Sequence, residues 1–105
     1  MPQTPYAAQS SVLTTAGGQN SALNVTATTV IKGSAGRVCR LIFNAASTSA
    51  PAVYDYAATT GFAAANLVWE GGTTTAAQTV VDLEFPCATG IVLVPSGATV
   101  SVSYL

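Results

Sequence analysis

The end of the chain alternates strictly between apolar and hydroxyl-bearing side chains, and only a β-strand with one buried face accommodates that pattern. Within Ala98–Leu105 the apolar positions are Val100, Val102 and Tyr104, and the hydroxyl positions are Thr99, Ser101 and Ser103. Successive side chains of a strand point to opposite faces, so a period of two places each set on its own side. We therefore predict a strand with its valines toward a core.

Similar short segments rich in β-branched residues, bounded by Gly, Pro and Ser, occur along the rest of the chain. They predict six further strands, at Leu23–Lys32, Arg37–Asn44, Pro51–Ala58, Phe62–Trp69, Gln78–Phe85 and Ala88–Val94. The connection at residues 33–36 predicts an antiparallel hairpin between the first two, and the continuous apolar run in the last predicts a strand buried on both faces. About seven strands at such spacing predict an all-β fold, a single antiparallel β-sandwich of the immunoglobulin or jelly-roll kind.

The alternation also predicts which side chains form the core. In Arg37–Asn44 the inward set is Cys39, Leu41 and Phe43, and the outward set is Val38, Arg40, Ile42 and Asn44. In Gln78–Phe85 the inward set is Val81, Leu83 and Phe85, and the outward set is Asp82 and Glu84.

The first 22 residues differ from the rest, because they are uncharged, interrupted by Pro2, Pro5 and Gly17-Gly18, and lack a lasting period. We divide the chain into an extended arm, residues 1–22, and a sandwich domain, residues 23–105. The alternative for the arm is a disordered tail, which is common at chain ends that nothing holds.

Charged residues make up 7% of the chain, with a net charge of −1, against roughly 25% in an average soluble domain. A monomer with so few charges would expose much neutral surface, whereas a protein covered by other subunits would not. Three basic residues cannot supply a phosphate-binding groove, so we expect no nucleic acid partner. No apolar run reaches the length of a membrane span and no basic leader precedes an apolar stretch, so we expect no membrane partner and a cytosolic site of synthesis.

Few residues suit catalysis. The chain has no histidine, the commonest general base and zinc ligand. Asp82 and Glu84 lie two apart, which allows an acid/base pair but is more typical of a solvated strand face. Cys39 and Cys87 lack an evident base, and we expect buried free thiols rather than a disulfide or a nucleophile. We predict no enzymatic activity, no cofactor and no metal.

Seven residues are predicted to contact other subunits. Arginine and tyrosine are enriched at protein interfaces, and apolar residues of an extended arm can pack along a neighbour. The predicted contacts are Arg37 and Arg40 near the hairpin, Tyr54 and Tyr56 around Asp55, and Tyr6, Val12 and Leu13 in the arm.

Three stretches resemble small structural proteins of tailed bacteriophages. They read VIKGSAGRVCRLIFN, AVYDYAATTGFAAAN and EFPCATGIVLVPSGATVSVSYL, and together they extend from Val30 to the C-terminus, about three quarters of the chain. The resemblance rests on the Lys-Gly-Ser-Ala-Gly-Arg turn, the Tyr-Asp with its Ala/Thr/Gly sequel, and the Phe-Pro-Cys-Ala-Thr-Gly-Ile junction. None of these names an active site.

The resemblance implies a virion component assembled in the bacterial host cytoplasm, most like a head decoration (cement) protein on the capsid surface. Its partner would be the major capsid protein. The low charge of the chain also predicts association with other copies of itself, and a homotrimer suits the three-fold positions of a capsid. One alternative is a tail, knob or fibre-base component of the same virion. A second alternative, from a different class, is a carbohydrate-binding β-sandwich in which Trp69 and Glu70 begin an aromatic platform.

Overall fold

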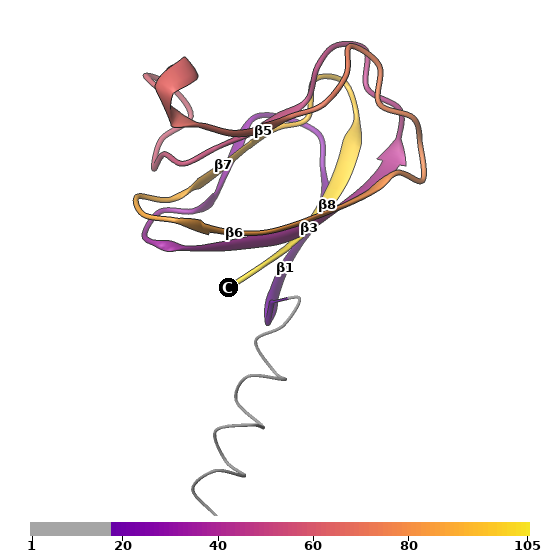
Figure 1. Ribbon diagram of the computed structural model, residues 1–105. Coiled ribbons are helices and arrows are strands. Elements are labelled where there is room, and N and C mark those ends of the chain that lie inside the picture. The colour runs from indigo at the N-terminus through magenta and orange to yellow at the C-terminus, as the bar shows by residue number, and fades with distance from the viewer. Residues whose placement is uncertain (1–17) are drawn as a thin grey trace, which may run out of the picture.

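The computed structural model describes residues 18–105, which form strands joined by loops and one short 3-10 turn, η1, at Ala64–Asn66 (Figure 1). The described strands are β1 Asn20–Val25, β2 Thr29–Lys32, β3 Gly36–Ala45, β4 Ala52–Tyr54, β5 Leu67–Glu70, β6 Val80–Cys87, β7 Ile91–Val94 and β8 Thr99–Tyr104.

The strands form two four-stranded antiparallel sheets that pack face to face (Figure 1). The first sheet has the order β1-β8-β3-β6 and the second has the order β2-β7-β4-β5. Successive strands cross between the sheets at every described connection except β4 to β5, which is the strand order of a jelly roll. The predicted all-β sandwich is confirmed, and of its two candidate architectures the strand order is that of the jelly roll.

The core lies between the sheets and is built by the apolar side of each alternating strand. From the first sheet it takes Leu41, Phe43, Val100 and Val102, and from the second it takes Val53, Ile91 and Leu93; all are buried. Each fully buried side chain of this size contributes roughly 1.5–3 kcal/mol relative to an exposed one. The predicted inward faces of β8 and of the middle of β3 are therefore confirmed.

The prediction that Ala88–Val94 is buried on both faces is confirmed for its second half. Ile91, Val92 and Leu93 are each fully buried in β7, which lies between β2 and β4 in the second sheet. Leu93 faces the core with Val53, whereas Val92 pairs with Tyr54 on the other face.

The predicted hairpin between Leu23–Lys32 and Arg37–Asn44 is wrong. The first segment divides into β1 and β2, and β2 pairs with β7, while β3 pairs with β6 and β8 in the other sheet. Residues 33–35 carry the chain across the sandwich instead of back along one sheet. Because β7 is buried, its backbone N–H and C=O groups need hydrogen-bond partners on both edges. β2 supplies them on one edge and β4 on the other.

The predicted alternation also fails at one end of β3. Two residues of β6, Leu83 and Glu84, lie opposite the single residue Cys39 of β3. This arrangement is a β-bulge in β6, and Glu84 within it has a φ of 46°. Beside the bulge Val38 is buried although it was predicted to face outward. Phe85 was predicted to face the core but is 46% exposed. The extra residue in β6 shifts the alternation of inward and outward side chains by one position in the part of the strand that follows it.

Strand boundaries differ elsewhere. Of the strand predicted at Pro51–Ala58, only Ala52–Tyr54 forms a strand. Of the strand predicted at Phe62–Trp69, only the last residues form one, because η1 occupies the middle of that segment. β6 continues through Pro86, which an edge strand tolerates because one side of it needs no hydrogen-bond donor. β1 begins at Asn20, so residues 20–22 of the predicted arm belong to the sandwich, and residues 1–17 lie outside the described residues.

Candidate binding surface

The outer face of the first sheet carries large apolar side chains that no described residue covers. Ile42 on β3 pairs with Val80 on β6 and with Ser101 on β8, so these three lie in one row across the sheet. Leu23 on β1 lies at the end of the same row, where a bulge sets it and Asn24 opposite Ser101. Leu23 is 70% exposed, Val80 61% and Ile42 42%.

A second row of polar side chains runs beside the apolar one. Register places Ser21, Ser103, Arg40 and Asp82 in line across the same four strands. The Arg40 Nε atom lies 4.0 Å from the Asp82 Oδ2 atom, so the charge of the arginine faces an opposite charge on its own chain.

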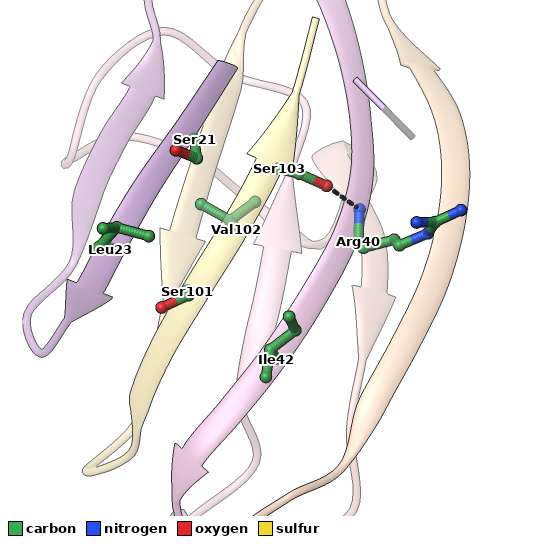
Figure 2. A pocket seen from close by; sticks show the side chains of 7 residues that line it. All are labelled: Ser21, Leu23, Arg40, Ile42, Ser101, Val102 and Ser103. Carbon is green, nitrogen blue, oxygen red and sulfur yellow. Dashed lines mark hydrogen bonds between the residues drawn. The ribbon is translucent and has the colours of Figure 1, made fainter. Parts of the chain in front are cut away.

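β8, which lies between β1 and β3, carries only hydroxyl-bearing side chains (Thr99, Ser101 and Ser103) on its outer face, and a groove results. Ser101 and Ser103 form the floor, with Leu23 and Ser21 on the β1 side and Arg40 and Ile42 on the β3 side (Figure 2). The groove is open and holds about 240 Å³. Small hydroxyl side chains between longer ones leave room above β8, and the Arg40 backbone N–H donates to Ser103 Oγ at 3.2 Å, which holds one side of the floor.

The two arginines predicted as contacts both lie beside acidic residues of β6. Arg37 Nη1 is 4.0 Å from Glu84 Oε1, as Arg40 is from Asp82. The side chains of both pairs are at least one third exposed to water, which screens their charges, so each pair contributes little to folding. The contact with another subunit that is predicted for both arginines stays a prediction, and only Arg40 of the two lines the groove.

The two predicted tyrosines lie on the other sheet, away from the groove. The ring of Tyr54 stacks on Phe62 with 4.3 Å between centroids, and Tyr56 meets Phe62 edge-on at 6.4 Å. Phe62 comes from the β4–β5 loop, so these rings fasten that loop over the second sheet. Both tyrosines are partly buried in this way, and their contact role stays a prediction.

Asp55, between the two tyrosines, holds the turn between β6 and β7 in place. Its Oδ1 atom accepts hydrogen bonds from the backbone N–H groups of Thr89 at 2.8 Å and Gly90 at 3.2 Å, and its Oδ2 atom accepts one from Ala88 at 2.9 Å. Desolvation alone would raise the pKa of Asp55, but these three donors outweigh it and hold the pKa below the usual 3.8. A carboxylate stabilised in its charged form is a poor proton donor, so Asp55 suits holding a turn better than acid catalysis.

The cysteines and acidic residues offer no nucleophile or proton-transfer pair. Cys39 and Cys87 are buried free thiols. Burial raises the pKa of both, to about 11 for Cys87, so neither is ionised near neutral pH. The bulge separates Asp82 from Glu84, and each faces its own arginine. Within residues 18–105 no three His, Cys, Asp or Glu side chains gather to hold a metal ion.

Trp69, which would begin the suggested sugar-binding platform, packs against the core of the sandwich. Its ring lies 6.2 Å from that of Phe43 and it packs, partly buried, against the core. A sugar-binding platform needs an exposed aromatic face, so this packing gives the carbohydrate alternative no support.

The remaining predicted contacts, Tyr6, Val12 and Leu13, lie outside the described residues. Over the described part of the chain, no helix has the length and apolar character to cross a membrane. Comparison with protein-family models, with curated proteins and with solved structures found no match.

The groove residues Leu23, Ile42 and Ser101 were not among the predicted contacts. One signal was present, because Ile42 is an apolar residue between Arg40 and Asn44 on the outward side of a predicted strand. A single exposed apolar side chain is ordinary, but several that lie together on a solvent-facing surface indicate a protein-binding site. The others come from β1 and β6, which no local pattern places beside β3.

Proposed function

We propose that this protein is a structural component of a tailed-bacteriophage virion, a head decoration (cement) protein that binds the major capsid protein on the capsid surface as a homotrimer. In this role it is assembled in the bacterial host cytoplasm, and it stabilises the head by bridging capsid subunits. It has no catalytic task.

The observation that carries the proposal is the outer face of the β1-β8-β3-β6 sheet. Leu23, Ile42 and Val80 are exposed in one row, and the charge of Arg40 beside them is met by Asp82. A neutral face with exposed apolar side chains is costly for a free monomer and favourable once another protein covers it. Protein contact, not chemistry, is what this face can provide.

The fold and the resemblance support the proposal in different ways. Jelly rolls occur in viral capsid proteins, but also in lectins and other proteins, so the fold is an analogy and not a proof. The three stretches that resemble phage structural proteins include β3, β4, β7 and β8, the strands that occupy the centres of both sheets. The low charge of the whole chain fits a protein whose surface is shared among many copies.

Binding to particles tests the proposal directly. The wild-type chain should copurify with phage heads at a fixed copy number and raise the temperature at which the heads disassemble. Ile42→Asp, which puts a charge into the apolar row, should weaken that binding, whereas Thr59→Asp on an exposed loop of the other sheet should not. Both variants should unfold at the wild-type temperature.

Three results would count against the decoration role. Copurification with isolated tails and not with heads would favour the tail or fibre-base alternative. Absence from all particles, together with specific binding on a glycan array, would favour the carbohydrate-binding alternative. Equal binding by Ile42→Asp and Thr59→Asp would remove the sheet face from the argument.

A further inference from the structure

The groove over β8 ends where the described chain begins. The Gln19 backbone N–H donates to the Tyr104 carbonyl oxygen at 3.1 Å, and Ser21, two residues on, already lines the groove. A Cβ atom at Gly18 would lie 2.7 Å from the same carbonyl oxygen, so the backbone there passes against the end of β8. Seventeen further residues precede this point.

Those residues match the groove in chemical character. Residues 1–17 contain no charged side chain, and their larger apolar residues are Met1, Tyr6, Val12 and Leu13. The groove is neutral as well, since Arg40 faces Asp82 and the remaining lining side chains are apolar or hydroxyl-bearing. A neutral segment can cover such a surface without leaving a charge buried and unpaired.

We propose that residues 1–17 of one copy dock into the β1–β8–β3 groove of a second copy. The direction of β1 favours a second copy over the same one. From Val25 to Asn20 this strand runs along the groove and leaves it at the Ser21 end, so a chain that continues in that direction moves away from its own groove. At roughly 3.3 Å per residue, seventeen extended residues span about 56 Å, enough to reach a neighbour.

An arm that leaves one copy and binds the next makes a head-to-tail contact, and such contacts close into a ring when the rotation allows. In a ring of three, every arm and every groove is used once. The inference deepens the homotrimer of the proposed function and rests on it for the presence of several copies, but it concerns a contact that can be tested in solution without particles.

Cross-linking between two differently tagged full-length chains tests the contact. One chain carries Leu13→Cys, and the other carries either Ser21→Cys in the groove or, as the matched control, Thr59→Cys on the opposite sheet. Ser21 and Thr59 are both exposed. The native thiols of Cys39 and Cys87 are buried, and wild-type chains treated in the same way measure their background.

We expect the Leu13→Cys chain to cross-link to the Ser21→Cys chain and not above background to the Thr59→Cys chain. Adding Leu23→Ser and Ile42→Ser to the groove chain should weaken the association by about tenfold or more, since two apolar contacts are lost. The thermal unfolding midpoint of that chain, measured in parallel, shows whether it is folded, and Leu23→Ser alone serves if the double change unfolds it.

Equal cross-linking at the two sites, or full cross-linking after the groove changes in a folded chain, would overturn the proposal. A chain carrying both Leu13→Cys and Ser21→Cys that cross-links only within itself, at a yield unaffected by dilution, would assign the groove to its own arm and would overturn it too. Head binding by a chain that fails these tests would leave the proposed function standing without the arm exchange.

Discussion

Replacing Asp55 by asparagine is expected to loosen the junction between the β4–β5 loop and the β6–β7 turn. The carboxylate accepts three backbone N–H donors at 2.8, 2.9 and 3.2 Å, from consecutive residues of that turn. Asparagine has nearly the same shape but only one acceptor oxygen, and its amide nitrogen would meet at least one of the three N–H groups. The variant therefore removes hydrogen bonds without opening a cavity.

The expected cost follows from the number and setting of these bonds. A hydrogen bond to a charged group contributes about 1.5–3 kcal/mol when it is shielded from water. Asp55 is partly exposed, so water replaces part of each lost bond, and we expect a loss of about 1–2 kcal/mol in the free energy of unfolding. For a domain of this size that corresponds to a fall in the melting temperature of roughly 5–15 °C.

The effect should depend on pH in a defined direction. The pKa of Asp55 is lower in the folded chain than its usual 3.8, so ionisation stabilises the folded state at pH values above the unfolded pKa. That stabilisation is lost as the pH falls through the folded pKa. The difference between wild type and Asp55→Asn should thus be complete at pH 7 and shrink below about pH 4.

Urea unfolding of both proteins at pH 7 and at about pH 2.5 measures this difference. Asp82→Asn is the matched control, because Asp82 is exposed and only faces Arg40 at 4.0 Å, so it should change stability by less than about 1 kcal/mol. Equal stability of wild type and Asp55→Asn at pH 7 would refute the reasoning, and so would a difference that persists unchanged in acid.

Three other changes have defined outcomes. Gly97→Ala should destabilise the domain by more than about 1 kcal/mol in thermal unfolding, because Gly97 has a φ of 88° and a Cβ there would collide with a neighbouring loop, whereas Gly72→Ala, with open space, should be nearly neutral. The double change Cys39→Ala and Cys87→Ala should cost about 1–3 kcal/mol in packing, and reductant should leave the wild-type unfolding midpoint unchanged; a large drop with reductant would mean that a disulfide forms. Deleting residues 1–17 should leave the β-rich circular dichroism spectrum intact and weaken binding to heads; unchanged binding would make the arm dispensable.

Which residues face the core could be predicted from the sequence wherever a strand is regular. The valines of β8 and the pair Leu41 and Phe43 of β3 are buried as their alternation predicts, because side chains one apart point to opposite faces. The predicted sides of Val38 and Phe85 are wrong because one extra residue in β6 interrupts the two-residue alternation. No residue near Glu84 in the sequence indicates a bulge.

Strand partners and the candidate surface could not be predicted in the same way. A turn-like run at residues 33–36 favours a hairpin locally, but β2 pairs instead with β7 and β3 with β6, strands that lie far along the chain, as in the pairs Thr29–Leu93 and Gly36–Cys87. The groove depends on those distant pairings, since its walls and floor come from β1, β3 and β8. Local patterns show which way Ile42 points, but not that Leu23 and Ser101 lie beside it.

The places of β7 and β8 set the order in which the domain can form during synthesis. Each is a central strand, β8 between β1 and β3 and β7 between β2 and β4, and both are made after every other described strand. Until residues 91–104 have left the ribosome, β1 and β2 lack any sheet partner, and β3 and β4 each lack one of their two neighbours. Pairings between strands far apart in sequence also form slowly. The nascent chain must therefore remain soluble with its future core open, and a chain released before Ile91 could complete neither sheet.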